Sequence, residues 1–69
     1  MQQPVASIVI PLLNEEESIL SLNSWIFKVL KTESFSFEII YIDDGSTDAS
    51  WNTIENLSKK NQNVRGFIN

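Results

Sequence analysis

Cysteine and histidine are both absent from this chain of 69 residues, and glycine and proline occur only twice each. Without cysteine there is no disulfide framework, and without either residue the chain lacks the usual ligands of a structural zinc site. The lack of histidine also removes the side chain that most often moves protons near neutral pH. Stabilisation by disulfides or zinc and catalysis by histidine are therefore excluded for these residues.

The chain is short for a protein of its composition. Its 69 residues are less than half of the ~150 typical of one domain, and a chain of this length buries only ~60% of its unfolded surface. Hydrophobic residues nevertheless make up 42% of the sequence, as in a globular protein rather than a disordered one. We therefore predict that residues 1–69 form part of a larger globular domain.

Acidic residues outnumber basic residues by nine to five, which gives a net charge of −4. A nucleic-acid-binding surface needs a basic stripe, and the adjacent pair Lys59 and Lys60 is better explained as the cationic end of a helix. Nucleic acid is therefore not an expected partner. The longest apolar run, residues 8–13, is far below the ~20 residues that span a bilayer, so we expect a cytoplasmic location.

Three segments have the pattern of β-strands. Residues 5–10, 37–42 and 64–68 are rich in β-branched and aromatic residues. The first is almost continuously apolar, which predicts a strand buried on both faces, and Pro11 is expected to end it. No hairpin turn signal joins any two of these segments.

Two segments between the strands have the pattern of helices. Asn14 is a good N-cap for the first helix, with Glu17 completing a capping box, and a break is expected at residues 34–36. The second helix is expected to begin near Thr47 or Asp48. Apolar residues recur every three or four positions in both, at Ile19, Leu22, Trp25, Ile26, Val29 and Leu30 in the first and at Trp51, Ile54 and Leu57 in the second. Strand-helix-strand alternation predicts an α/β fold with parallel strands joined by right-handed crossovers.

Polar residues follow the first two strands at the points where they end. In open α/β sheets ligands bind at this carboxyl edge, which places residues 11–15 and 43–48 together. Both stretches have a simple structural alternative, as a helix cap and as an Asx-type turn. Capping alone does not explain the adjacent carboxylates Asp43 and Asp44, which repel each other and need polar compensation nearby.

The chain does not match several known phosphate-binding and signalling motifs, because the residues that these motifs require are absent or stand at other positions. The chain has neither a Gly-x-Gly-x-x-Gly run nor a Gly-Lys-Ser/Thr loop. An aspartyl-nucleophile phosphatase would need aspartate at the position of Ile42. In a response-regulator receiver the acidic pair follows the first strand, whereas here it follows the second.

Residues 7–16 (SIVIPLLNEE) and 40–48 (IYIDDGSTD) together resemble the N-terminal motifs of glycosyltransferase family 2. In this family one strand ends in Pro-x-Tyr-Asn-Glu, and about 30 residues later another ends in Asp-Asp-Gly-Ser. The nearest subgroup is the polyprenyl-phosphate sugar synthases, such as dolichol-phosphate mannose synthase and undecaprenyl-phosphate glycosyltransferases. The resemblance covers nearly the whole chain, but the chain covers only the first part of the family's catalytic domain.

The resemblance implies a GT-A fold, whose N-terminal part is a Rossmann-like β-α-β-α-β parallel half-sheet that binds the nucleotide of a nucleotide-sugar donor. Its implied substrate-binding residues are Pro11, Leu13 and Glu15 from the first strand, and Ile42 and Asp44, with Asp43 orienting the loop, from the second. A carboxylate suits this task because it accepts strong hydrogen bonds from base N–H groups and ribose hydroxyls.

Two departures from the family pattern matter. Leu13 stands where the family has tyrosine, so an aromatic platform for the base is missing. The family's Asp-x-Asp motif is absent from the chain, so no catalytic or metal-binding residue is assigned to it, and the Mg²⁺ or Mn²⁺ that the family implies would be held elsewhere. We expect residues 1–69 alone to be inactive.

Our first functional hypothesis is therefore part of a glycosyltransferase that moves a sugar from a nucleotide donor to an acceptor, with metal assistance. The implied acceptor is a polyprenyl phosphate at the cytoplasmic face of a membrane, in a role such as cell-wall or polysaccharide biosynthesis. The alternatives are a non-catalytic nucleotide-binding module and a receiver-like signalling domain. Because the half-sheet exposes a strand edge, we also expect self-association.

Overall fold

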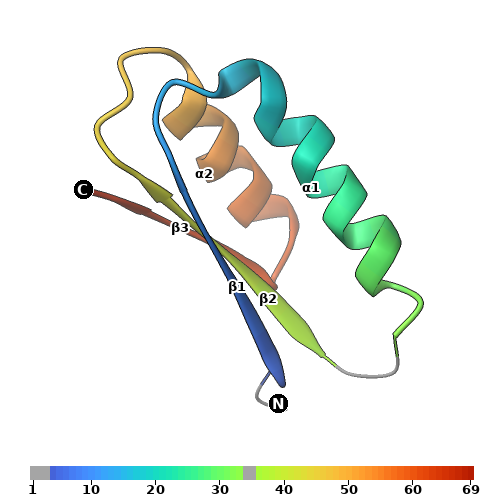
Figure 1. Ribbon diagram of the computed structural model, residues 1–69. Coiled ribbons are helices and arrows are strands. Elements are labelled where there is room, and N and C mark those ends of the chain that lie inside the picture. The colour runs from blue at the N-terminus through green and yellow to red at the C-terminus, as the bar shows by residue number, and fades with distance from the viewer. Residues whose placement is uncertain (1–3, 34–35) are drawn as a thin grey trace.

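The computed structural model describes residues 4–33 and 36–69. The chain forms a β-α-β-α-β unit (Figure 1). Its elements are β1 (Ala6–Leu12), α1 (Glu16–Leu30), β2 (Phe37–Asp43), α2 (Ser50–Lys60) and β3 (Val64–Ile68). The predicted α/β class is confirmed. The break expected at residues 34–36 includes residues 34 and 35, which lie outside the described part of the chain.

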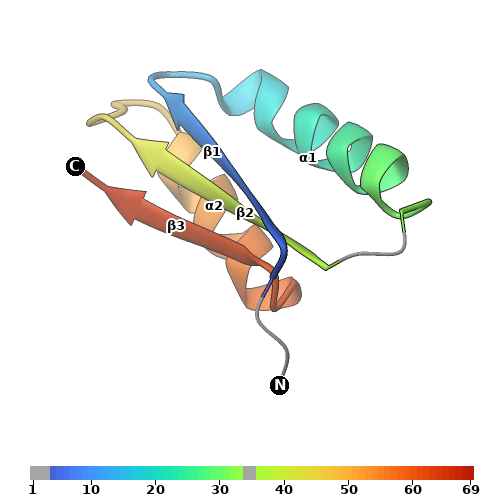
Figure 2. The same cartoon turned by 60° about the horizontal axis from the view of Figure 1, so that its bottom comes forward.

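The strands form one parallel sheet in the order β1-β2-β3. Both crossovers step in the same direction across the sheet, so both helices lie over the same face (Figures 1 and 2). Side chains on that face are buried, including Ile39, Tyr41 and Val64. On the opposite face Val9 and Phe67 remain about half exposed, at 53% and 49%. The sheet is thus a half-covered layer.

The core lies between the sheet and the two helices. Its buried apolar residues are Leu12, Ile19, Ile26, Ile39, Tyr41, Ile54, Leu57 and Val64. Tyr41 also donates a hydrogen bond of 2.7 Å from its hydroxyl to Oδ1 of Asn23 on α1, and both side chains are buried. Burial raises the pKa of Tyr41 to about 12, so the hydroxyl stays a donor at any physiological pH.

Two predictions about β1 are wrong. Pro11 lies inside the strand instead of ending it. The reason is that β1 is an edge strand: the carbonyl of Leu12 accepts from Asp44 N–H on the β2 side, so the adjacent Pro11 directs its missing donor away from the sheet. The strand is also covered on one face only, because both helices pack on the same side.

The apolar stripe of α1 is only partly covered. Ile19 and Ile26 are buried, whereas Trp25 and Val29 are 62% and 43% exposed. The helix lies along the β1 side of the sheet, so part of its stripe extends past the last strand (Figure 2). The result is an apolar groove of about 420 Å³, here called the edge groove, lined by Ile8, Ile10, Leu22, Trp25, Ile26, Val29 and Leu30.

Replacing Gly66 by alanine is expected to destabilise the fold. A Cβ at Gly66 would lie within van der Waals overlap of Ile54 Cγ2 and 3.3 Å from Trp51 Cζ3, so α2 could not keep its present distance from β3. Overpacking of this kind costs about 1–3 kcal/mol. Urea denaturation of Gly66→Ala measures it, and an unchanged midpoint would show that α2 shifts at no cost.

Candidate functional site at the carboxyl edge of the sheet

Two loops meet at the carboxyl edge of the sheet (Figure 1). The first loop, residues 13–15, joins β1 to α1, and the second loop, residues 44–49, joins β2 to α2. Each loop contains one residue with left-handed backbone geometry, Asn14 at φ 52° and Gly45 at φ 89°. Glycine adopts this geometry without strain and asparagine tolerates it better than most residues.

Asn14 joins the two loops. Its Oδ1 accepts hydrogen bonds from the backbone N–H groups of Thr47 at 2.8 Å and Asp48 at 3.3 Å, and its own N–H donates to Ser46 Oγ at 2.8 Å. The predicted role of Asn14 as N-cap of α1 is wrong: the cap position is Glu15, and it makes no side-chain cap bond. The left-handed turn at Asn14 directs its amide across to the second loop.

The start of α1 is capped from the second loop instead. Glu15 N–H donates to Ser50 Oγ at 2.8 Å, and Glu16 N–H donates to Asp48 Oδ2 at 3.3 Å. The capping box with Glu17 is therefore not formed. The second helix begins at Ser50, two or three residues later than predicted, and Asp48 accepts from Ser50 N–H at 2.9 Å.

Hydrogen bonds hold the pKa of the Asp48 carboxyl below its ordinary value. The largest contribution comes from the side chain of Ser50. Burial opposes it as the next largest effect, and the backbone N–H groups of Ser50, Glu16 and Asp48 itself lower the pKa further. A lowered pKa means that the folded state favours the carboxylate. The stability that Asp48 contributes is therefore present above the ordinary aspartate pKa and is lost as the pH falls through the folded value.

The adjacent carboxylates Asp43 and Asp44 have different surroundings. Asp43 is fully buried, and its Oδ1 accepts from Ser46 N–H at 2.8 Å and from Ser46 Oγ at 2.6 Å. Its Oδ2 has no hydrogen-bond partner among the described residues. Asp44 is exposed, and its Oδ1 accepts from Asn69 Nδ2 at 3.1 Å. Asp43 thus bonds within the second loop, while Asp44 presents a carboxylate to solvent.

The six substrate-binding residues implied by the resemblance lie at one edge but in different settings. Pro11, Leu13 and Glu15 line one open pocket of about 440 Å³ at the β1 side. Ile42 pairs with Pro11 in the strand register, and both lie on the sheet face away from the helices. Asp44 is exposed at the start of the second loop, directly after β2. Asp43, by contrast, lies beneath the second loop and is not accessible.

Sequence reasoning missed the residues that hold the two loops together. Ser46, Asp48 and Ser50 all accept backbone N–H groups of the first loop or of the first turn of α1. The available signal was the run of short hydrogen-bonding side chains after Gly45, opposite an asparagine that tolerates a left-handed turn. Their partners lie more than 30 residues away in sequence, so local patterns did not identify them.

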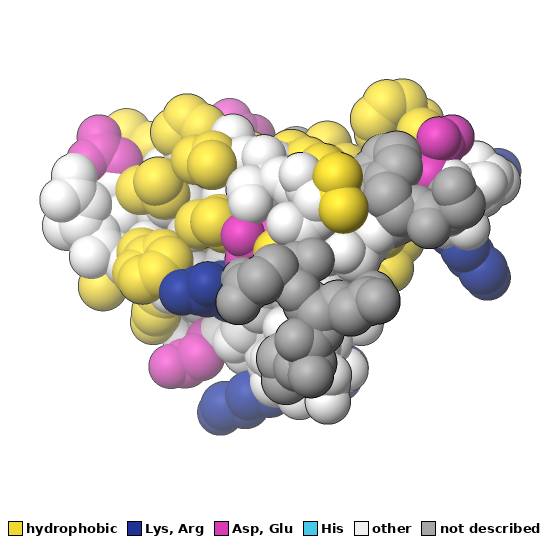
Figure 3. All heavy atoms as spheres, turned by 90° about the horizontal axis from the view of Figure 1, so that it is seen from below, with side chains coloured by type: hydrophobic (Ala, Val, Ile, Leu, Met, Phe, Trp, Pro, Cys, Tyr) yellow, Lys and Arg dark blue, Asp and Glu magenta, His cyan; other side chains and the backbone are white. Residues whose placement is uncertain are grey.

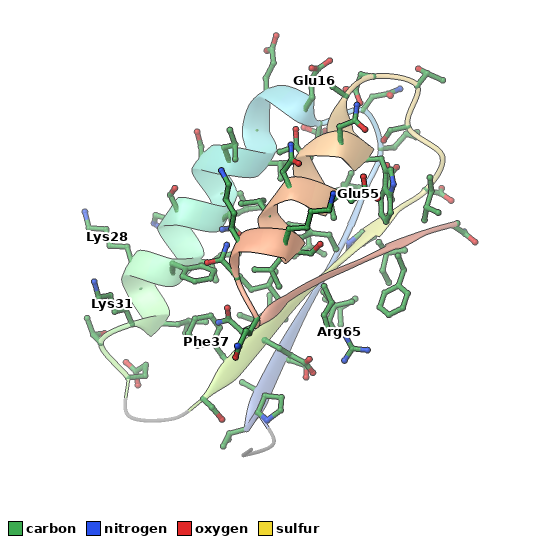
Figure 4. All side chains as sticks on the ribbon, turned by 180° about the vertical axis from the view of Figure 1, so that it is seen from behind. Glu16, Lys28, Lys31, Phe37, Glu55 and Arg65 are labelled. Carbon is green, nitrogen blue, oxygen red and sulfur yellow. The ribbon has the colours of Figure 1, made fainter. Side chains whose placement is uncertain are left out.

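The carboxyl edge is acidic in the part of the chain that the structure describes. Glu16 lies at this end of α1, whereas Lys28 and Lys31 lie at the opposite end (Figure 4). Arg65 on β3 forms an ion pair with Glu38 on β2, at 3.5 Å. The described residues thus place no cation beside Asp44 to receive a phosphate. They also contain no cluster of three acidic, histidine or cysteine side chains fit to hold a metal ion.

Neither helix in the described ranges is long and apolar enough to cross a membrane.

A family profile and several known proteins match this chain, and all of them are glycosyltransferases. The profile of Glycosyl transferase family 2 matches residues 7–69. An uncharacterized glycosyltransferase of Haemophilus influenzae is 39% identical over 99% of this chain, which spans 26% of that relative. An undecaprenyl-phosphate 4-deoxy-4-formamido-L-arabinose transferase of Proteus mirabilis is 39% identical over 83% of the chain and 18% of the relative.

A dolichol-phosphate mannosyltransferase of Pyrococcus furiosus is 37% identical over 78% of the chain and 15% of its own length. No solved structure matches the chain significantly. The chain therefore spans about a quarter or less of the length of these relatives. Because the family profile covers nearly all of its residues, the chain belongs to glycosyltransferase family 2.

Proposed function

We propose that residues 1–69 are the nucleotide-binding part of an enzyme that transfers a sugar from a nucleotide-sugar donor to a polyprenyl phosphate. Family membership supports glycosyl transfer, and two of the relatives are named for undecaprenyl-phosphate and dolichol-phosphate substrates. An acceptor of that kind would bring the enzyme to the cytoplasmic face of a membrane. The receiver-like alternative has no support in the comparisons.

The nucleotide-binding role rests on two features of the carboxyl edge: the open pocket that Pro11, Leu13 and Glu15 line at the β1 side, and the exposed Asp44 carboxylate at the end of β2. Apolar side chains with a few convergent polar groups are typical of small-molecule sites. Pro11 and Leu13 offer apolar contact to a base, and the carboxylates of Glu15 and Asp44 accept hydrogen bonds from base N–H groups or ribose hydroxyls. Hydrogen bonding thus takes a larger share of base recognition than aromatic stacking.

The same site is poorly suited to bind the diphosphate. No cation faces it among the described residues, and its carboxylates would repel phosphate oxygens. In the proposed enzyme a divalent metal, Mg²⁺ or Mn²⁺, would neutralise the diphosphate leaving group. The described residues do not fit such a metal, and we assign no catalytic residue to them.

Replacing Asp44 by alanine is expected to weaken nucleotide binding about 10- to 100-fold, because hydrogen bonds to a charged group are worth about 1.5–3 kcal/mol. Glu16→Ala is the matched control: it removes another exposed carboxylate at the same edge, and it keeps the backbone N–H through which Glu16 bonds to Asp48. Isothermal titration with a panel of nucleoside diphosphates measures both variants.

A second control separates recognition from loop structure. Asn69→Ala removes the only side-chain hydrogen bond of Asp44 recorded in the described residues but keeps the carboxylate, so it should retain affinity. Equal losses for Asp44→Ala and Glu16→Ala would contradict the assignment of Asp44. Loss of affinity in Asn69→Ala to the level of Asp44→Ala would instead show that Asp44 acts through its contact with Asn69.

A further inference from the structure

Hydrogen bonds from side chains hold the two loops of the candidate site together. In each of these bonds a side-chain oxygen of one loop, or of the helix start after it, accepts a backbone N–H group of the other. The side chains that accept are Asn14, Ser46, Asp48 and Ser50, here called the loop clasp. Because every donor belongs to the backbone, the loop clasp determines how the two chain segments lie relative to each other.

Asn14 is the part of the loop clasp that belongs to the first loop. Its Oδ1 accepts from the N–H groups of Thr47 and Asp48, and its own N–H donates to Ser46 Oγ at 2.8 Å. Because both groups that face the amide are donors, the oxygen of the amide must point to the second loop. The left-handed backbone at φ 52° gives the side chain this direction. Asn14 is therefore bonded to the second loop through its backbone and its side chain at once.

The second loop extends this contact to Asp44. Ser46 Oγ, which accepts from Asn14, donates its own hydrogen to Oδ1 of the buried Asp43 at 2.6 Å. Asp43 directly precedes Asp44, whose N–H donates to the Leu12 carbonyl at 3.0 Å. The backbone position of Asp44 is thus fixed relative to the first loop by hydrogen bonds that lie wholly within the described chain.

The neighbours of Asn14 in the sequence line the open pocket at the β1 side. Leu13 precedes Asn14 and Glu15 follows it, and both line that pocket, whereas Asn14 does not. A change in how Asn14 is held would therefore move Leu13 and Glu15 relative to Asp44. The side chain of Asn14 can thus affect the site from outside the pocket.

We propose that Asn14 is a positioning residue of the nucleotide site. By holding the first loop against the second, it fixes where Leu13 and Glu15 lie relative to Asp44 before the nucleotide arrives. Such preorganisation raises affinity, because binding then does not have to order the loops. The inference rests on the function proposed above, and it assigns to Asn14 no contact with the nucleotide.

The contribution of Asn14 is geometric and not electrostatic. Its amide is neutral, and the groups that it binds are backbone N–H groups. Figure 3 views the molecule from the end opposite the carboxyl edge, and lysine and arginine side chains are visible there. Lys28 and Lys31 lie at that end of α1 (Figure 4). Salt should therefore not alter the effect of a substitution at Asn14 that changes no charge.

Isothermal titration with UDP, GDP, ADP and CDP tests the inference. Asn14→Gly removes the acceptor but suits the left-handed backbone. We expect it to weaken the binding of whichever diphosphate the protein takes by about 3- to 30-fold, a range typical of residues that act on a site without touching the ligand. Ser46→Ala removes the acceptor of the Asn14 N–H group and should weaken binding as well. Asn14→Asp keeps an acceptor oxygen and should retain most of the affinity at high salt, where the added charge is screened.

Two controls separate positioning from a general loss of stability. Ile54→Val removes one methyl group from the fully buried core beside β3, outside the loop clasp, so it should lower stability by a similar amount and keep the affinity. Asn14→Gly should cost less affinity in the Asp44→Ala background than in the unmodified protein, because no carboxylate is then left there to position. Circular dichroism verifies that each variant is folded.

Unchanged affinity in Asn14→Gly and Ser46→Ala would overturn the inference, while a loss in Asp44→Ala would leave the proposed function standing. Equal losses in Asn14→Asp and Asn14→Gly at high salt would also overturn it, because the amide itself would then contact the nucleotide. Equal losses in Ile54→Val and Asn14→Gly would show that affinity follows stability and not loop position. Binding of none of the diphosphates by the unmodified protein would contradict the proposed function, and this inference with it.

Discussion

Replacing Ile19 by alanine is expected to lower the free energy of unfolding by about 2–5 kcal/mol, as is usual when a buried isoleucine is truncated. Ile19 is 1% exposed and packs in the core between α1 and the sheet. In a domain of this size such a loss is a large part of the total stability. Urea denaturation followed by far-UV circular dichroism measures it, at one fixed protein concentration because self-association would add to stability.

Leu20 provides the matched control for Ile19. It is the next residue of the same helix but is 58% exposed. Leu20→Ala should change the free energy of unfolding by about 0.5 kcal/mol or less, as expected for a surface position. Equal losses at the two positions would mean that α1 packs against the sheet with a different face.

Replacing Asn14 by alanine is expected to cost about 1.5–4 kcal/mol. One part is the loss of the acceptor for the Thr47 and Asp48 N–H groups, comparable to a lost helix cap at about 0.5–2 kcal/mol. The other part is the strain of a left-handed backbone at φ 52°, about 1–2 kcal/mol for an ordinary residue.

Three substitutions at this position separate the two contributions. Asn14→Gly relieves the backbone strain but removes the acceptor. It should therefore lose only the contribution of the acceptor to the free energy of unfolding, about 0.5–2 kcal/mol. Asn14→Asp keeps an acceptor oxygen and should be the mildest of the three. Alanine should therefore be the most destabilising substitution and aspartate the least, when measured by urea denaturation. If Gly and Ala were equally destabilising, backbone strain at Asn14 would not contribute.

The sequence by itself determined the elements and their order. β-branched runs and helical spacing of apolar residues predicted three strands and two helices, and alternation predicted a parallel α/β sheet. The prediction for 64–68 coincides with β3. The prediction for β2 ends one residue early, and that for β1 begins one residue early and ends two residues early. These features follow from local propensity and periodicity, which neighbouring residues determine.

Part of the candidate site could also be predicted. Parallel strands bring their carboxyl ends to one edge, so residues 11–15 and 43–48 were expected together, and the structure places them there. The separation of Asp43 from Asp44 was only partly foreseen. The difference arises because Ser46 donates a hydrogen bond to Asp43 and not to Asp44. The left-handed backbone of Gly45 lies between them in the same turn.

The tertiary structure alone decided how the helix ends are capped and which surfaces remain open. Local sequence predicts Asn14 as the cap of its own helix. In the structure the start of α1 is capped from the second loop and Asn14 bonds to that loop, because the crossover brings residues more than 30 positions apart into contact. Pro11 could stay in a strand only because β1 is at the edge of the sheet. Burial of Ile19 but not Trp25 depends on where α1 lies relative to that edge, a position that periodicity within the helix does not contain.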